Sequence, residues 1–235
     1  MSESDVRSVS YRVEASLGLA YFALYFVYLF ANPENEAMHW LTLVFLPLAL
    51  LHVLQVRRGG TIRDTFASVG LRMNNWKTGL RWAAVLGLTL SILQLFISNR
   101  GEAIWALIVS GKALFLLPIA FVLLFLTAAF TEEFFFRGII QGRLGAWFQN
   151  RIWAVLLTSV LFGMYHIPYA YLNPNWPTHG QLGPAIASAM GQGVIGGLVL
   201  GTVYERSGRN LVAPVLVHTL INLLPAMTMI KFGGA

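Results

Sequence analysis

Seven long apolar runs divide the 235-residue sequence, and they constrain the fold more than any other feature. Each run approaches or exceeds the length of helix needed to cross the hydrocarbon core of a bilayer. In hydrocarbon a backbone has to satisfy its own hydrogen bonds, so runs of this length are expected to be helical. They cover residues 13–31, 38–56, 79–98, 103–144, 152–167, 182–204 and 211–230. We therefore expect an all-α fold, a polytopic transmembrane bundle of about seven to eight helices.

Charged residues are scarce and lie mostly between the apolar runs. Hydrophobic residues make up 57% of the chain and charged residues 11%, whereas roughly 25% of the residues in a soluble protein are charged. The net charge of +6 comes from short segments and forms no basic domain, which argues against a nucleic-acid partner and favours contact with the lipid bilayer. The absence of cysteine excludes disulfides, thiolate metal ligands and a cysteine nucleophile.

The distribution of basic residues predicts an orientation in the membrane. Arg100, Lys112 and Lys231 lie on one side of the predicted spans, and the other thirteen of the 16 lysines and arginines lie on the side of the N-terminus. Because short cytoplasmic loops are enriched in Lys and Arg, we expect the N-terminus of this cell-membrane protein in the cytoplasm. The basic segment 57–77 on that side is expected to form an interfacial helix or a loop.

Three runs carry signals for a helix break or for close packing. Gly111-Lys112 interrupts the fourth run, which is too long for one crossing, and predicts a short helix before the main one. Pro168, Pro174 and Pro177 follow His166 closely and predict that the helix of the fifth run ends near this histidine. In the sixth run small residues recur at every fourth position, which predicts the close approach of another helix. These residues are Ala185, Ala189, Gly193, Gly197 and Gly201.

Two adjacent carboxylates in the fourth run are the first indication of function. Glu132 and Glu133 lie in an apolar setting, where an ionised group costs several kcal/mol and therefore suggests a functional site. Glu133 and Arg137 are four residues apart, so on a helix they share a face and neutralise each other. Glu132 lies about 100° away and has no local partner. We therefore expect structural support from Glu133 and Arg137, and chemistry from Glu132.

Two further pairs of residues four positions apart lie inside apolar runs, Phe162 with His166 and His218 with Asn222. Taken singly, each polar member would be a hydrogen-bonded packing residue. At a rise of ~1.5 Å per residue, however, Glu132, His166 and His218 reach similar depths in the membrane. Facing helices of a bundle build polar sites in this way. We therefore expect one shared polar site, with Phe162 packing as support and the nearby Tyr165 and Tyr169 in an interfacial aromatic belt.

The three motifs, in this order, resemble those of the CPBP intramembrane proteases, a family named for CAAX proteases and bacteriocin-processing enzymes and also called the Abi family. In this sequence the family's EExxxR, FxxxH and HxxxN patterns are Glu132 to Arg137, Phe162 to His166 and His218 to Asn222. The resemblance makes residues 101–235 a catalytic helical core and residues 1–100 a set of N-terminal spans with the basic segment. Both parts are expected to form one integral membrane domain.

The resemblance implies an intramembrane endopeptidase. It implies that Glu132 and His166 activate a water molecule that attacks a peptide bond, while His218 and Asn222 stabilise the oxyanion. The implied substrate is a membrane-associated protein or peptide, such as a C-terminal sorting signal, a leader peptide or a lipidated tail.

The chemistry of the site leaves two questions open. Glu132, His166 and His218 would also suit a divalent metal such as zinc, so the cofactor is either such a metal or none. The alternative to an enzyme is a non-enzymatic membrane protein, either a proton-coupled transporter or a regulatory scaffold.

Overall fold

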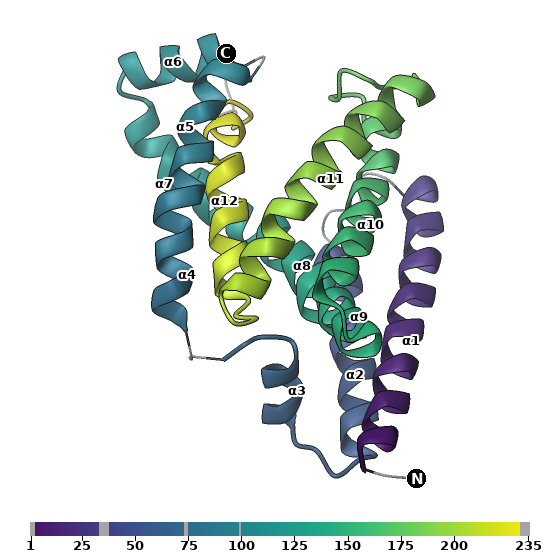
Figure 1. The fold of residues 1–235 in the computed structure, drawn as a ribbon. Coiled ribbons are helices and arrows are strands. Elements are labelled where there is room, and N and C mark those ends of the chain that lie inside the picture. The colour runs from purple at the N-terminus through teal and green to yellow at the C-terminus, as the bar shows by residue number, and fades with distance from the viewer. Residues whose placement is uncertain (1–2, 33–37, 73–74, 99, 231–235) are drawn as a thin grey trace.

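The computed structural model describes residues 3–32, 38–72, 75–98 and 100–230, which form helices joined by short connections (Figure 1). These residues contain no β-strand. The elements, with η denoting a π-helix, are α1 (Glu3–Ala31), η2 (Trp40–Phe45), α2 (Leu46–Val56), α3 (Ile62–Ser68), α4 (Trp76–Trp82), η3 (Ala83–Gly87), α5 (Leu88–Ile97), α6 (Gly101–Val109), α7 (Ala113–Leu124), η4 (Phe125–Ala129), α8 (Phe130–Glu133), η5 (Phe134–Gln141), α9 (Gly142–Phe148), α10 (Arg151–Leu172), α11 (Leu182–Arg206) and α12 (Val212–Met227).

Seven helical stretches correspond to the seven apolar runs. Five are long and apolar enough to cross a membrane, and they are Tyr11–Ala31, Trp76–Ile97, Ala113–Phe148, Arg151–Leu172 and Leu182–Arg206. Two shorter apolar helices, Trp40–Val56 and Val212–Met227, complete the set. The predicted all-α, multi-pass membrane bundle is therefore confirmed.

The predicted break in the fourth run is present. α6 ends at Val109, and Gly111 adopts a φ of 73° before α7 begins at Ala113. Glycine adopts this left-handed conformation without the steric penalty of a side chain. From Ala113 the chain is helical without interruption to Phe148, so the candidate carboxylates lie within one long helix.

The fifth helix ends close to the predicted place, at Leu172 and before Pro174, but Pro168 itself does not break it. α10 continues through this proline to Leu172. Proline removes one backbone hydrogen bond and crowds the preceding turn, at a cost of about 3 kcal/mol in an isolated helix. In a membrane bundle such prolines are tolerated where neighbouring helices support the chain. Here Pro168 is itself buried, so packing holds the helix together on both sides of it.

α11 packs against α10 through its small residues (Figure 1). A Cβ atom added to Gly193 would lie 2.6 Å from the Cα atom of Gly163. One added to Gly197 would lie 2.7 Å from the Cα atom of Ser159. Real Cβ contacts are not this short, so glycine is required at both positions. The backbones of the two helices therefore approach closely, as the four-residue spacing predicts.

The remaining helices surround this pair. α12 packs against α4, α5 and α7 on one side, while α1 packs against α9 and α10 on the other (Figure 1). The basic segment contains α3, which begins with a capping box between Thr61 and Asp64. α3 lies at the same end of the bundle as the described N-terminal residues, and α6 lies at the opposite end (Figure 1). Lys231 lies outside the described residues, and the orientation in the membrane stays a prediction.

Candidate active site

Three helices bring Glu132, His166 and His218 together. Glu132 comes from α8, His166 from α10 and His218 from α12. The Nε2 atoms of His166 and His218 lie 3.9 Å and 4.0 Å from Oε2 of Glu132. Both separations are too long for a direct hydrogen bond, and this buried carboxylate oxygen has no hydrogen-bond partner among the described residues. Two imidazoles thus face one unpaired carboxylate oxygen.

The other nitrogen of each imidazole is held by a hydrogen bond. Nδ1 of His166 lies 2.8 Å from the backbone carbonyl oxygen of Phe162, and Nδ1 of His218 lies 2.9 Å from Oε1 of Glu133. A carbonyl oxygen and an ion-paired carboxylate only accept hydrogen bonds, so each Nδ1 is the donor. Each Nδ1 therefore carries a hydrogen, and each Nε2 is directed at Glu132.

Arg137 is fully buried, and three neighbouring groups stabilise its positive charge. One of its terminal nitrogens lies 3.1 Å from Oε1 of Glu133, and the other donates to the carbonyl oxygen of Gly197 over 3.2 Å. Its guanidinium carbon lies 4.4 Å from the centre of the Phe162 ring, within the range of a cation–π interaction. Because Glu133 also binds His218, the ion pair holds a histidine of the site as well as neutralising charge.

The π-helix η5 follows directly after the two glutamates. All eight of its residues, Phe134–Gln141, are buried. π-Helical turns are uncommon and occur frequently at functional sites. The ring of Phe136 packs edge-on against the ring of Phe162, with 5.1 Å between the centroids. Phe136 of the first motif therefore packs against Phe162, the residue whose carbonyl oxygen orients His166.

Asn222 lies one turn after His218 on the same face of α12. It is half-buried, and its side chain makes no hydrogen bond to another described residue.

The candidate metal ligands do not fit a metal ion in this geometry. Donor atoms of a tetrahedral zinc site lie roughly 3.3 Å apart, given metal–ligand distances of about 2.0 Å. The Glu132 oxygen lies farther than this from the nitrogens of both His166 and His218. Across the described part of the chain, no group of three or more His, Asp or Glu side chains is arranged to hold a metal.

Two tyrosines near the site lie in an environment that the sequence does not predict. Tyr165 and Tyr169 were expected in an interfacial belt, but both are buried, with 1% and 8% of their surface exposed. The hydroxyl of Tyr169 lies 2.8 Å from Nε2 of His39, which precedes η2. His39 is 130 positions away in the sequence, and no spacing rule connects residues so far apart.

The comparisons with known proteins agree with the resemblance. The family model described as type II CAAX prenyl endopeptidase Rce1-like matches residues 113–224, which include all three motifs. It belongs to the CPBP, or Abi, family. The searches of curated proteins and of solved structures return no match.

Proposed function

Because residues 113–224 belong to the Rce1-like family of type II CAAX prenyl endopeptidases, we propose that this multi-pass membrane protein is an intramembrane endopeptidase whose water nucleophile is activated by Glu132. One observation supports this role above the others. Glu132 is buried with an unpaired carboxylate oxygen, and the Nε2 atoms of two oriented imidazoles face that oxygen. A general base has to be within hydrogen-bond reach of the proton that it removes, or separated from it by one water molecule.

In the proposed reaction, a water molecule donates one hydrogen bond to Oε2 of Glu132 and a second to Nε2 of His166. Glu132 takes a proton as the water oxygen attacks the carbonyl carbon of the peptide bond. The same carboxyl group then returns the proton to the leaving nitrogen when the tetrahedral intermediate collapses. Glu132 thus accepts the proton and gives it back within one reaction cycle, so no second acidic residue is needed.

His218 and Asn222 are proposed to stabilise the oxyanion of that intermediate. Asn222 donates through its amide group. His218 donates through Nε2 in the imidazolium form, and the contact of Nδ1 with Glu133 stabilises that form. We expect Asn222→Ala to lower the cleavage rate ~10–10³-fold, the range for loss of one oxyanion donor. Steady-state kinetics should show the loss in kcat with KM little changed.

The proposed substrates are membrane-associated: a lipidated tail, a leader peptide or a C-terminal sorting signal. The description of the matching family favours a prenylated CAAX tail as the first to test. Purified protein in proteoliposomes would be incubated with a peptide of each class, and new termini would be identified by mass spectrometry. In parallel, candidate membrane-anchored proteins would be co-expressed with the wild type.

Glu132→Gln provides the decisive control because it keeps the size of the side chain and removes the base. We expect new termini with the wild-type protein and none with this variant. The same termini in both samples would assign cleavage to a contaminating protease. A biological effect that survives Glu132→Gln would instead favour the regulatory scaffold.

A further inference from the structure

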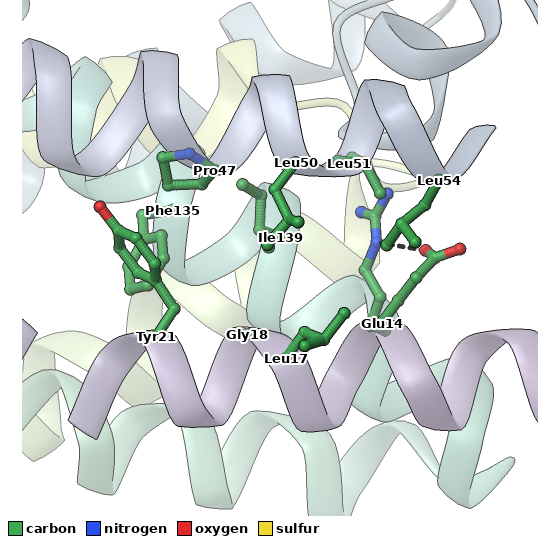
Figure 2. A pocket seen from close by; sticks show the side chains of 11 residues that line it. Glu14, Leu17, Gly18, Tyr21, Pro47, Leu50, Leu51, Leu54, Phe135 and Ile139 are labelled. Carbon is green, nitrogen blue, oxygen red and sulfur yellow. Dashed lines mark hydrogen bonds and ion pairs between the residues drawn. The ribbon is translucent and has the colours of Figure 1, made fainter. Parts of the chain in front are cut away.

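A groove runs between α1 and α2 and contains none of the proposed catalytic residues (Figure 2). It is a shallow groove rather than an enclosed cavity, and its space of about 350 Å³ includes the part that is open to the surroundings. Tyr21 and Pro47 lie at one end, and Glu14 and Leu54 lie at the other (Figure 2). From Glu14 to Tyr21 the groove extends ~10 Å along α1, compared with roughly 15 Å for the hydrocarbon of one leaflet.

The walls of the groove suit a hydrocarbon chain. Its middle is lined by leucine side chains from both helices and by Ile139 of the long central helix (Figure 2). Leu17 and Leu50 are 37% and 40% exposed, so the groove opens between two apolar helices toward their surroundings. In a membrane those surroundings are lipid acyl chains.

Gly18 leaves the middle of the groove open. A Cβ atom at this position would meet only side-chain atoms of Ile139 and Ile140, at 3.8–3.9 Å, which is ordinary van der Waals contact. Packing therefore does not require glycine here, in contrast to the glycines between α10 and α11. The missing side chain gives space to whatever occupies the groove.

Two arginines share one carboxylate at the end of the groove. Glu14 and Arg143 line this end, and Glu14 forms ion pairs with Arg143 and with Arg58 beside the groove. The guanidinium of Arg143 also donates to Ser68. Arg58, however, is 36% exposed at its side chain and bonds Glu14 through one terminal nitrogen, which leaves its remaining N–H groups for an anion.

We propose that the α1–α2 groove binds one acyl chain of an anionic phospholipid, whose phosphate contacts Arg58. The apolar walls, the opening between two membrane helices and the space at Gly18 accommodate the chain. The surplus cation at the basic end of the bundle complements the headgroup. Phe135 and Ile139 line the groove and follow Glu132 in the same continuous helix, so the lipid packs against the helix that carries the catalytic carboxylate.

The test uses phosphatidylglycerol with a photoactivatable group in one acyl chain. The full-length protein is reconstituted in phosphatidylcholine vesicles containing a small fraction of this probe, irradiated, and digested for mass spectrometry. We expect labelled peptides from the groove-lining stretches 14–21 and 47–54. A phosphatidylcholine probe with the same photoactivatable chain should label these stretches much less.

Two pairs of variants make the test specific. Gly18→Phe fills the groove and should reduce labelling at least ~5-fold, because the added ring takes the volume of the chain. Gly191→Phe is its control, since Gly191 is an exposed helical glycine of α11 with no atom within 4 Å of an added Cβ. Arg58→Gln should remove the preference for phosphatidylglycerol, whereas Arg63→Gln, the same charge change on exposed α3, should keep it.

Three results would overturn the proposal. Unchanged labelling in Gly18→Phe would place the probe outside the groove. Equal labelling by the two lipid probes in the wild type would show only nonspecific contact with bilayer lipid. If Gly18→Phe does not fold, the Arg58 pair decides the outcome, because a preference that survives Arg58→Gln excludes the proposed headgroup contact.

Discussion

The helix Ala113–Phe148 contributes arginines to two clusters of carboxylates and arginines, and the clusters differ in how their carboxylates are paired. At its basic end, Arg143 and Arg58 both bind Glu14. In the middle, Arg137 binds Glu133, while the neighbouring Glu132 binds no arginine. Glu14, Glu132 and Glu133 are the buried carboxylates of the described residues, and Glu132 is the one without a cationic arginine. The carboxylates of Glu14 and Glu133 are thus paired with arginines, whereas the proposed base is not. One oxygen of Glu132 and one of Glu133 lack a hydrogen-bond partner among the described residues, so the arginine pairing is what distinguishes the two glutamates.

The largest expected effect is on the cleavage rate, and it distinguishes Glu132 from the carboxylates that are paired with arginines. We predict that Glu132→Gln and His166→Ala each lower the cleavage rate at least ~10²-fold, because both remove groups that position and deprotonate water. The matched variant Glu14→Gln makes the same chemical change in the other cluster and should keep most of the activity. Rates would be measured on the substrate identified by mapping termini. Near-normal turnover in either site variant would refute the assigned role.

Arg137→Ala should chiefly affect stability. It leaves the carboxylate of Glu133 buried without a counter-charge, which costs roughly 3–5 kcal/mol. Folded yield in detergent and the midpoint of thermal unfolding would measure the loss. The double variant Glu133→Gln with Arg137→Met should recover much of the yield, because no unpaired charge remains. Activity should stay low in that variant, since His218 has lost its ionic partner. A normally folded Arg137→Ala protein without activity would instead indicate a direct role in catalysis.

Glu14→Gln should destabilise the protein less than Arg137→Ala does. Arg143 keeps acceptors on Ser68 and Gly138 when Glu14 is neutral, and Arg58 is partly exposed to solvent. We expect a loss of about 1–3 kcal/mol, the usual cost of an imperfectly satisfied buried polar group. Equilibrium unfolding of Glu14→Gln and Arg137→Ala under the same conditions would compare the two clusters directly. A larger loss for Glu14→Gln would reverse the order proposed here.

The smallest effect concerns an exposed carboxylate on α3. Hydrogen bonds from the side chain and backbone of Thr61 lower the pKa of Asp64. A lowered pKa in the folded state means that the capping box contributes stability at neutral pH and loses it as the pH falls below about 4. Thr61→Val removes the hydroxyl donor and should return the pKa of Asp64 toward its ordinary value. NMR titration of the side-chain carboxyl group would detect the change, and an unchanged pKa would exclude the hydroxyl as its cause.

Most of the fold could be predicted because hydrocarbon permits few backbone structures. Apolar length located the seven apolar helical stretches, five of which are long enough to cross a membrane, and Gly111 located the break before the long helix. Pro168 misled because the rule for proline describes an isolated helix, whereas α10 is supported by its neighbours. That residues 1–100 and 101–235 together form one integral membrane domain stays a prediction.

Contacts within one helix could be predicted at the site, and contacts between helices could not. The pair of Glu133 and Arg137 follows from a spacing of four residues. The contact of Glu133 with His218 spans 85 positions, and that of Glu14 with Arg143 spans 129. Such pairs depend on how far one helix is shifted along another. That shift is set by side-chain packing, which the motifs do not encode.

The glycine contact between α10 and α11 also has a mechanical consequence. Backbone atoms meet at Gly163 and Gly193, so no layer of side chains lies between the helices there to change rotamers and let them slide. His166 and the Gly197 carbonyl that receives Arg137 are therefore carried on one rigid body. If a polypeptide enters the proposed site, we expect this pair of helices to move as a unit against the helices bearing Glu132 and His218. The gap between base and imidazole would then widen by tilting a pair of helices rather than by turning a ring.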